Sequence, residues 1–247
     1  IDEVNAPPYE DTIFKGDVWQ FTTEPIAYLI AGDEITASAS SSKATDQGPE
    51  NTINGSGLDA NDMHSTVATD MWLSGDEPNG AWIEYELDKV YKLHEMWVWN
   101  HNTLSEDDAG YGLKDVTIEY SENGADYTTL GGTTHEFAQA PLPSAPGYEH
   151  NTEVPFGVAA KYVKITPNSN WGGTEKYGLS EVRFFRIPVR AREPNPADEA
   201  TDVPLDVVLS WRAGREAGTH NLYLSTDEQA VTQGTISPSS IPAAGGC

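Results

Sequence analysis

The residues from Asn100 to Asn102 place three hydrogen-bonding side chains in a row, an asparagine, a histidine and an asparagine. Tyr111 follows between two glycines, and Trp171 precedes two more in the stretch NSNWGG. Aromatic rings offer a large apolar surface, and a few directed polar groups fix the orientation of a ligand against it. This combination suits a neutral sugar, whose C–H face packs on a ring while its hydroxyls bond to Asn and His. We therefore predict that Asn100, His101, Asn102, Tyr111 and Trp171 contact a glycan.

Each of these residues also has a structural interpretation. Asn100 and Asn102 can cap their own turn, because Asn side chains bond readily to nearby backbone groups. Trp171 can pack within its own glycine-rich loop. His101 has no Cys or carboxylate at metal-ligand spacing, which favours a hydrogen bond to ligand over metal coordination. The sequence alone leaves these alternatives open.

The charge of the chain restricts its partners. It has 39 acidic and 14 basic residues and a formal net charge of −25. Nucleic acids and anionic membrane surfaces are bound through clusters of Lys and Arg, so neither is expected as a partner. The same field argues against strongly sulfated or carboxylated glycans. A neutral ligand or a cation is the expected partner, although acidity often reflects only a solvated surface.

Several classes of chemistry find no support in the sequence. The single cysteine, Cys247, excludes an intrachain disulfide. No apolar run approaches the roughly 20 residues that span a bilayer. Nucleophile-elbow, phosphate-loop and zinc-helix motifs are absent, so we predict a binding protein rather than an enzyme. The chain starts at Ile1 and shows no signal peptide, which indicates a piece of a longer protein.

Alternating apolar and polar residues predict an all-β fold. The alternating stretches are Ala81–Leu87, Glu95–Trp99, Asp115–Ser121, Lys161–Thr166 and Glu181–Ile187. Asn123-Gly124 is typical of a tight turn and predicts a hairpin with the returning strand Asp126–Leu130. Ile35–Ser42 and Tyr177–Phe185 are the first and last strands of this region. We expect them to lie side by side in an antiparallel sandwich.

Shifts in composition divide the chain into three parts. The proline-rich stretch Pro188–Pro196 indicates a stiff linker, and residues 28–189 form the predicted main domain. Residues 1–27, with a strand at Asp17–Thr22, resemble the closing strands of a fibronectin type III or immunoglobulin-like repeat. Residues 190–247 resemble the opening strands of such a repeat. We expect these two fragments of neighbouring domains to pair into a second, smaller partial sandwich.

The main domain resembles a known family. The phrases that carry the resemblance are, in chain order, ITASASSS, ENTINGSGLDANDMHST, MWLSG, WIEYELDKVYKLHEMWVWN, GLKDVTIEYSENGADYTTL, AKYVKITPNSNWGG and YGLSEVRFF. Residues 33–187 resemble a discoidin domain, the coagulation factor 5/8 type C domain, and most closely bacterial family 32 carbohydrate-binding modules. The resemblance implies a jelly-roll β-sandwich of about eight strands. It also implies that ligands bind in loops at one end of the sandwich.

The first long loop adds two ligand candidates, His64 and, shortly after it, Trp72. Trp72 also matches a tryptophan that is often structural in the family. Both interpretations of this residue stay open.

The resemblance further implies a structural calcium ion, held by the loop Asn51–Ser65 and closed by a Glu of the last strand. Calcium takes about six to eight oxygen ligands, many of them backbone carbonyls. The candidate ligands are Asn54, Gly57, Asp59, Ser65 and Glu181. Asn54 stands where the family commonly has Asp, which lowers the ligand charge and weakens the site. The alternative is a loop without metal, in which Glu181 accepts backbone N–H bonds.

Together these features predict a non-catalytic carbohydrate-binding module from a secreted or surface-attached bacterial protein. Its expected partners are a neutral oligo- or polysaccharide and the neighbouring domains of the parent chain, with no nucleic acid and no membrane. The alternative is a structural or protein-interaction module that spaces domains in an extracellular array. Lipid binding, known from clotting-factor discoidin domains, conflicts with the net charge of −25.

Overall fold

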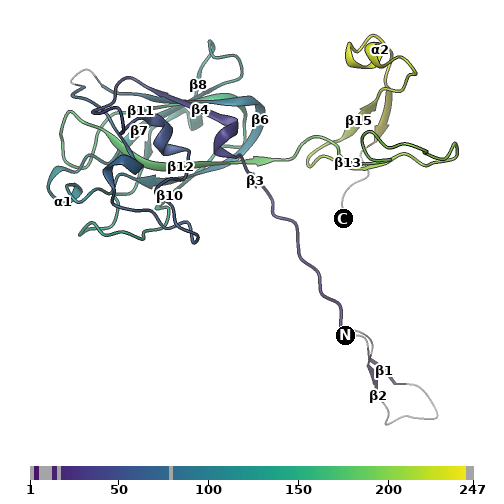
Figure 1. Ribbon diagram of the computed structural model, residues 1–247, viewed down its shortest axis with the longest axis horizontal. Helices are drawn as coiled ribbons and strands as arrows, with labels where there is room; N and C mark the ends of the chain where they lie inside the picture. The colour runs from purple at the N-terminus through teal and green to yellow at the C-terminus, as the bar shows by residue number, and fades with distance from the viewer. Residues whose placement is uncertain (1–2, 6–12, 16–17, 78–79, 243–247) are drawn as a thin grey trace.

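The computed structural model describes residues 3–5, 13–15, 18–77 and 80–242. A large β-sandwich lies at one side, and smaller strand pairs follow it (Figure 1). The helices among the described residues are short. They are α1 (Glu106–Ala109), α2 (Glu228–Thr232) and single 3₁₀ turns at Gly32–Glu34, Pro49–Thr52, Ala68–Asp70 and Leu130–Gly132. None of the described helices is long and apolar enough to cross a membrane. The predicted all-β class is confirmed.

Ten strands build the sandwich. They are β3 (Tyr28–Leu29), β4 (Ile35–Ala39), β5 (Trp72–Leu73), β6 (Ile83–Asn100), β7 (Asp115–Ser121), β8 (Thr128–Thr129), β9 (His135–Glu136), β10 (Thr152–Pro155), β11 (Ala159–Pro167) and β12 (Gly178–Ile187). β6 runs through both layers. Its first half pairs with β4 and β11, and its second half pairs with β10 and β12. β7 extends the first layer and carries β8 and β9, while β3 and β5 pair with β12.

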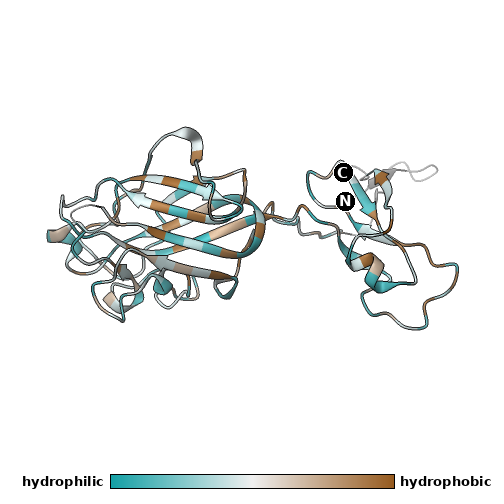
Figure 2. Ribbon diagram, turned by 90° about the horizontal axis from the view of Figure 1, so that it is seen from above, coloured by the Kyte–Doolittle hydropathy of each residue, from teal (hydrophilic) through white to brown (hydrophobic). Residues whose placement is uncertain are grey.

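The alternation along β6 places its apolar side chains between the layers. Ile83, Tyr85 and Leu87 are fully buried, as the pattern predicts. The Tyr85 ring meets Phe184 of β12 edge-on at 5.3 Å between centroids, so the two layers touch through aromatic contact. Brown and teal residues alternate along the strands in Figure 2. Each such buried side chain contributes about 1.5–3 kcal/mol. The two strands predicted at Ala81–Leu87 and Glu95–Trp99 are one continuous strand.

One prediction about strand neighbours needs correction. The strand at Ile35–Ala39 pairs with β6, not with the last strand β12. Its predicted place beside β12 is taken by β3, through Leu29 opposite Phe185. The chain therefore enters the sandwich one short strand earlier than the sequence pattern suggests.

The hairpin around Asn123-Gly124 is confirmed, but its turn is wider than predicted. β7 and β8 pair through Glu119 opposite Thr129 and Tyr120 opposite Thr128. Gly124 has a φ of 73°, whereas Asn123 lies outside the left-handed region. The Asn123 Oδ1 atom instead accepts the backbone N–H groups of Ala125 and Asp126, at 2.9 Å each. Side-chain capping thus replaces the two-residue turn.

The two ends of the chain form separate strand pairs within the described residues. β1 (Glu3–Asn5) pairs with β2 (Ile13–Lys15), β13 (Arg192–Asn195) with β14 (Ser210–Arg212), and β15 (Thr219–Leu222) with β16 (Ser239–Pro242). No described strand of one end pairs with a strand of the other. The expected strand at Asp17–Thr22 is not formed over 18–22, and Trp19 and Phe21 are each 87% exposed there. The joint partial sandwich and the repeat-like character of the ends stay a prediction.

One carboxylate nevertheless joins the two ends. The Glu24 carboxylate lies 2.7 Å from Arg192 and 3.1 Å from Arg215, and it also pairs with Arg212. The Tyr28 hydroxyl donates to the same group. Tyr28 and the three guanidinium groups lower the pKa of Glu24 from 4.5 to about 2. We call these five residues the Glu24 clasp.

Replacing Glu24 by Gln removes the charge that the three arginines share. We expect residues 190–242 to be held less firmly against the sandwich in this variant. Small-angle scattering should then measure a larger radius of gyration. The melting temperature of the sandwich should stay the same, because its core is not touched. Because the pKa of Glu24 is lowered, the clasp is fully present above pH 4.5 and is lost as the pH falls toward 2. An unchanged radius in Glu24→Gln, relative to the exposed-site control Glu122→Gln, would contradict this role.

Candidate functional site

Loops gather at the end of the sandwich where β6 ends and α1 lies (Figure 1). They connect β6 to β7 (101–114), β9 to β10 (137–151) and β11 to β12 (168–177). Backbone contacts join them directly: the N–H of Gly172 donates to the carbonyl of Gly110 at 2.7 Å. A Cβ at residue 172 would lie 1.7 Å from the Ala109 carbonyl oxygen, so only glycine fits there. The loops that carry the predicted ligand residues therefore form one connected surface.

Asn100 anchors this surface from below. Its Nδ2 donates to the carbonyls of Leu113 at 2.7 Å and Ala138 at 2.8 Å. Its Oδ1 accepts the N–H groups of His101 at 3.0 Å and Leu113 at 2.9 Å. The side chain is fully buried and uses its whole hydrogen-bonding capacity. Asn100 therefore cannot contact a glycan in this conformation, and it ties three segments together instead.

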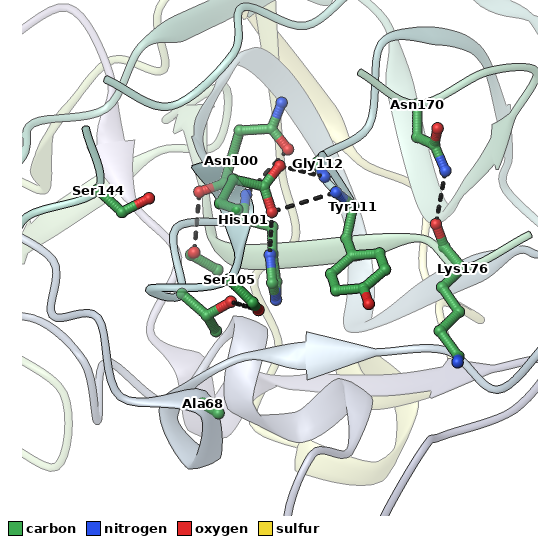
Figure 3. A network of polar contacts seen from close by, with 12 residues as sticks. Ala68, Asn100, His101, Ser105, Tyr111, Gly112, Ser144, Asn170 and Lys176 are labelled. Carbon is green, nitrogen blue, oxygen red and sulfur yellow. Dashed lines mark hydrogen bonds and ion pairs between the residues drawn. The ribbon is translucent and has the colours of Figure 1, made fainter. Parts of the chain in front are cut away.

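A buried hydrogen-bonded pair, His101 and Glu106, holds the loop that carries Tyr111 (Figure 3). The Nδ1 of His101 lies 2.7 Å from the Oε2 of Glu106, and both side chains are 0% exposed. The same carboxylate accepts the backbone N–H groups of Tyr111 at 3.1 Å and Gly112 at 2.8 Å. On the other side of the histidine, a Cβ at Gly178 would lie 2.4 Å from the imidazole ring. His101 is thus a positioning residue, which fixes the loop rather than facing solvent.

Tyr111 and Trp171 are the predicted ligand residues that keep exposed surface. The Tyr111 ring meets the His101 ring edge-on, with 5.9 Å between centroids and 77° between planes. The Trp171 Nε1 donates to the carbonyl of Phe137 at 3.2 Å. The Nζ of Lys114 lies 4.8 Å from the Trp171 ring centroid. Both rings are half-buried, so each is held in place while part of it stays open to solvent.

Three other predicted ligand residues are buried as well. Asn102 and Trp72 are fully buried, and their side chains donate to the carbonyls of Ala145 and Ser41, at 2.9 Å in both cases. The structural interpretation of Trp72 therefore accounts for its position. His64 is also fully buried. Asn102, Trp72 and His64 have no exposed surface and support the loops from within. The prediction that they touch a ligand therefore needs correction.

His64 belongs to a buried polar layer under the loops. Its Nδ1 lies 3.0 Å from the carbonyl of Ser65, and its ring lies 5.9 Å from that of Tyr148. Burial lowers the pKa of His64 below 6.5, so the imidazole is neutral at pH 7. The hydroxyls of Tyr148 and Ser180 both donate to the carbonyl of Asn100. These bonds attach the end of β6 to the loops around it.

Among the predicted calcium ligands, Glu181 has the environment that a cation would suit. The side chain is 2% exposed, and its Oε2 has no hydrogen-bond partner in the described chain. Burial raises the pKa of Glu181 to about 8, against the opposing effects of the Gly55 N–H and Arg183. An unpaired buried carboxylate oxygen is costly unless a positive charge or a donor satisfies it. The Gly55 N–H also matches the alternative of a hydrogen-bonded loop.

The other four predicted calcium ligands have hydrogen-bond partners within this loop or just after it. The Asp59 Oδ1 accepts the N–H groups of residues 61 and 63, and the Ser65 Oγ donates to Asp70 at 2.6 Å. The Asn54 Oδ1 accepts the N–H of residue 56, and the Gly57 carbonyl accepts that of Ser65. No three His, Cys, Asp or Glu side chains converge on a shared position in the described residues. Calcium at this loop stays a prediction that rests on Glu181.

Comparison with known proteins identifies the sandwich. Residues 34–182 match the sequence model of the F5/8 type C domain, which is more than half of the 247 residues. The chain belongs to the F5/8 type C domain family. The resemblance read from residues 33–187 is thereby confirmed. No curated protein sequence matches the chain.

Several solved structures are similar to the F5/8 type C domain at low sequence identity. CBM32-3 from a family 31 glycoside hydrolase of Clostridium perfringens has a TM-score of 0.48 and 17% identity over 64% of this chain and 94% of that chain. The family 32 module of Clostridium perfringens NanJ, in complex with galactose, has a TM-score of 0.45 and 18% identity over 65% and 100%. A mutant chitosan-binding module 1 from a Paenibacillus sp. IK-5 chitosanase/glucanase has 0.41 and 19% over 61% and 92%.

Sequence reasoning missed the residues that hold the loops of the F5/8 type C domain. Glu106 stands in the acidic run EDD, where nothing distinguishes the buried carboxylate from its exposed neighbours. Tyr148 and Ser180 likewise carry no local signal. Gly112 and Gly178 did offer one: each flanks an aromatic residue, and each packs too closely against Asn100 or His101 to carry a side chain freely.

Replacing Glu106 by Ala leaves the buried N–H groups of Tyr111 and Gly112 without an acceptor. We expect the free energy of unfolding of the F5/8 type C domain to fall by at least about 2 kcal/mol. Urea denaturation measures this loss, and amide exchange of Tyr111 should accelerate more than that of β11. The matched control on the same helix is Asp108→Ala, an exposed site expected to change stability by less than about 0.5 kcal/mol. Equal stability of the two variants would refute the role given to Glu106.

Proposed function

We propose that the F5/8 type C domain is a non-catalytic carbohydrate-binding module that holds a neutral oligo- or polysaccharide on Tyr111 and Trp171. One observation carries the proposal: two half-exposed aromatic side chains lie on loops that are joined directly. The backbone N–H of Trp171 donates to the Gly112 carbonyl at 3.1 Å. Rings fixed in this way present apolar surface without a large loss of side-chain entropy on binding. Family membership and the sequence resemblance to carbohydrate-binding modules add support.

The polar groups of this surface favour binding over reaction. A glycoside hydrolase needs two carboxylates, one to protonate the leaving group and one to act as base or nucleophile. Glu106, whose carboxylate accepts the backbone N–H of Tyr111, accepts three hydrogen bonds in all and is 1% exposed. It holds the loop and is not free to act on a substrate. The exposed Gly172 and Gly173 let a ligand approach the backbone beside Trp171.

A neutral ligand fits the electrostatics of the whole chain. The net charge of −25 repels polyanions at long range and leaves uncharged sugars unaffected. Affinity for one sugar should be modest, because few side chains contribute. Within a larger secreted or surface-attached bacterial protein, such a module would raise the local concentration of its neighbours on a polysaccharide.

A second candidate function rests on the Glu24 clasp. The segment before the sandwich and the segment after it share one carboxylate, at 2.7 Å from Arg192 and 3.1 Å from Arg215. This arrangement favours a spacer that fixes the direction of neighbouring domains in an extracellular array. The two functions are compatible, but only the first requires a ligand on Tyr111 and Trp171.

We further propose that a calcium ion binds at Glu181 and has a structural role. The buried, unpaired Oε2 of Glu181 supports this assignment. Backbone carbonyls of the loop 51–65 would supply the remaining oxygens, with Asn54, Gly57, Asp59 and Ser65 as the candidate positions. When bound, the ion would neutralise the buried carboxylate and attach the loop to β12.

Truncating either ring of Tyr111 and Trp171, here called the aromatic pair, should weaken glycan binding. We expect Trp171→Ala and Tyr111→Ala each to weaken binding about tenfold or more, because each removes apolar contact surface. Affinity electrophoresis across neutral polysaccharides and a glycan array measure the effect. Trp82→Ala is the matched control, since Trp82 is half-buried elsewhere on the sandwich with Lys164 5.0 Å from its ring.

The outcomes separate the two candidate functions. Retardation of the wild type that is lost in both aromatic variants and kept in Trp82→Ala supports the binding module. No retardation by any glycan would leave the spacer. Binding that survives both substitutions would show that the ligand sits elsewhere.

Removal of calcium should lower the melting temperature of the F5/8 type C domain. A ligand of the native state stabilises by mass action, by about 2.7 kcal/mol at a hundredfold excess over its dissociation constant. We expect chelation to lower the melting temperature and added calcium to restore it. In Glu181→Gln this calcium-dependent difference should disappear, whereas in the exposed-site control Glu50→Gln it should persist. A wild-type melting temperature that is indifferent to chelator would rule the ion out.

A further inference from the structure

A concave site lies at the end of the sandwich opposite α1. Its cavity has a volume of about 360 Å³ and is lined by β3, the bend of β6, the end of β12 and the linker after it. This volume is within the usual range of about 300–1,000 Å³ for small-ligand sites. β12 begins at Gly178 among the ligand loops and ends at Ile187 in this cavity. The two sites are therefore about 30 Å apart along one strand.

The lining of this cavity is basic, in contrast to the rest of the chain. Lys89, Lys92, Arg186, Arg190 and Arg192 line it, five of only 14 basic residues in the sequence. One acidic residue, Glu193, also lines it, and this carboxylate pairs with Arg212 at 3.3 Å. We call this cavity the basic pocket. Its lining is locally rich in cations on a chain of net charge −25, which favours an anionic ligand over a cationic one at this place.

Some of these cations already have partners and others do not. Lys89 pairs with Asp88 at 2.8 Å and Arg192 with Glu24 at 2.7 Å, while Lys92 donates to the Gly157 carbonyl. Arg190 is exposed and forms no ion pair with any described residue. The Nε of Arg186 is buried and has no hydrogen-bond partner in the described chain. Arg186 and Arg190 therefore retain the capacity to bind an anion.

The Arg186 guanidinium is held in a defined place. Its central carbon lies 5.3 Å from the Tyr91 ring centroid, and the Nζ of Lys89 lies 4.9 Å from the same ring. Tyr91 is 7% exposed and belongs to the core of the sandwich. A guanidinium that is already held against an aromatic ring loses little conformational freedom when it binds a ligand. Its two parallel N–H groups match the two oxygens of one carboxylate.

We propose that the basic pocket binds a carboxylated sugar, such as a uronic acid residue at the end of a glycan chain. The −25 field would repel a polyanion, whereas a single carboxylate on an otherwise neutral chain enters a locally positive cavity. Arginine clusters also recognise acidic peptide motifs, so an acidic peptide is the alternative occupant that the experiment must distinguish. The basic pocket is separate from Tyr111 and Trp171, so it stands whether or not those rings bind a sugar.

The test compares two sugars that differ only in the acidic group. The full chain is titrated at low salt with galacturonic acid and with galactose, and NMR follows the side-chain Nε–H signals of Arg186 and Arg190. We expect galacturonic acid to shift these signals and galactose to leave them unchanged. Arg186→Gln and Arg190→Gln should each weaken the binding about tenfold. Arg190 is exposed, so its variant keeps the fold, and Lys43→Gln, an exposed cation outside the pocket, should bind as the wild type does.

Four results would overturn the proposal. The first is an absence of shifts with galacturonic acid. The second is equal binding of acetate, which would make the pocket a site for any small carboxylate. The third is tighter binding of an acidic peptide than of the sugar. The fourth is a response confined to the Trp171 indole signal, which would place the acidic sugar on the aromatic pair.

Discussion

The pairing of β6 with four other strands is the constraint on which the rest of the structure depends. Its first half belongs to one layer and its second half to the other, so the strand fixes how the layers face each other. The bend between the halves lines the basic pocket, and the last residue, Asn100, supports the aromatic pair. Any change that shifts the register of β6 would therefore displace both surfaces together.

The ligand loops are ordered from beneath by polar groups rather than by apolar packing alone. Asn100, His101 and Glu106 are buried; Asn100 and Glu106 bond to loop backbone, and His101 bonds to the Glu106 carboxylate. Tyr111 and Trp171 can then keep part of each ring in solvent without being mobile. A surface of this kind is built before a ligand arrives, which lowers the entropy that binding must overcome.

The fold class, the main strands and the family were accessible from the sequence, because the alternation at Ile83, Tyr85 and Leu87 and the ordered phrases are local signals. The location of the loops was accessible too. The burial of individual polar residues was not accessible. Asn100, His101 and Asn102 are residue types common in binding surfaces, but they lie beneath the loop surface. Whether a polar side chain faces solvent depends on loops distant in sequence, such as the segment at Ala138 and Ala145. The same holds for β3, whose two residues are too few to show a period.

The Glu24 clasp has a mechanical consequence. Because Glu24 precedes the sandwich and its arginine partners follow it, a force applied to both flanks of the chain passes from residue 24 directly to residues 192–215. The strands between them lie outside the line of tension as long as the ion pairs hold. We expect tension on the two flanks to load these few charge contacts first, leaving the sandwich itself undeformed.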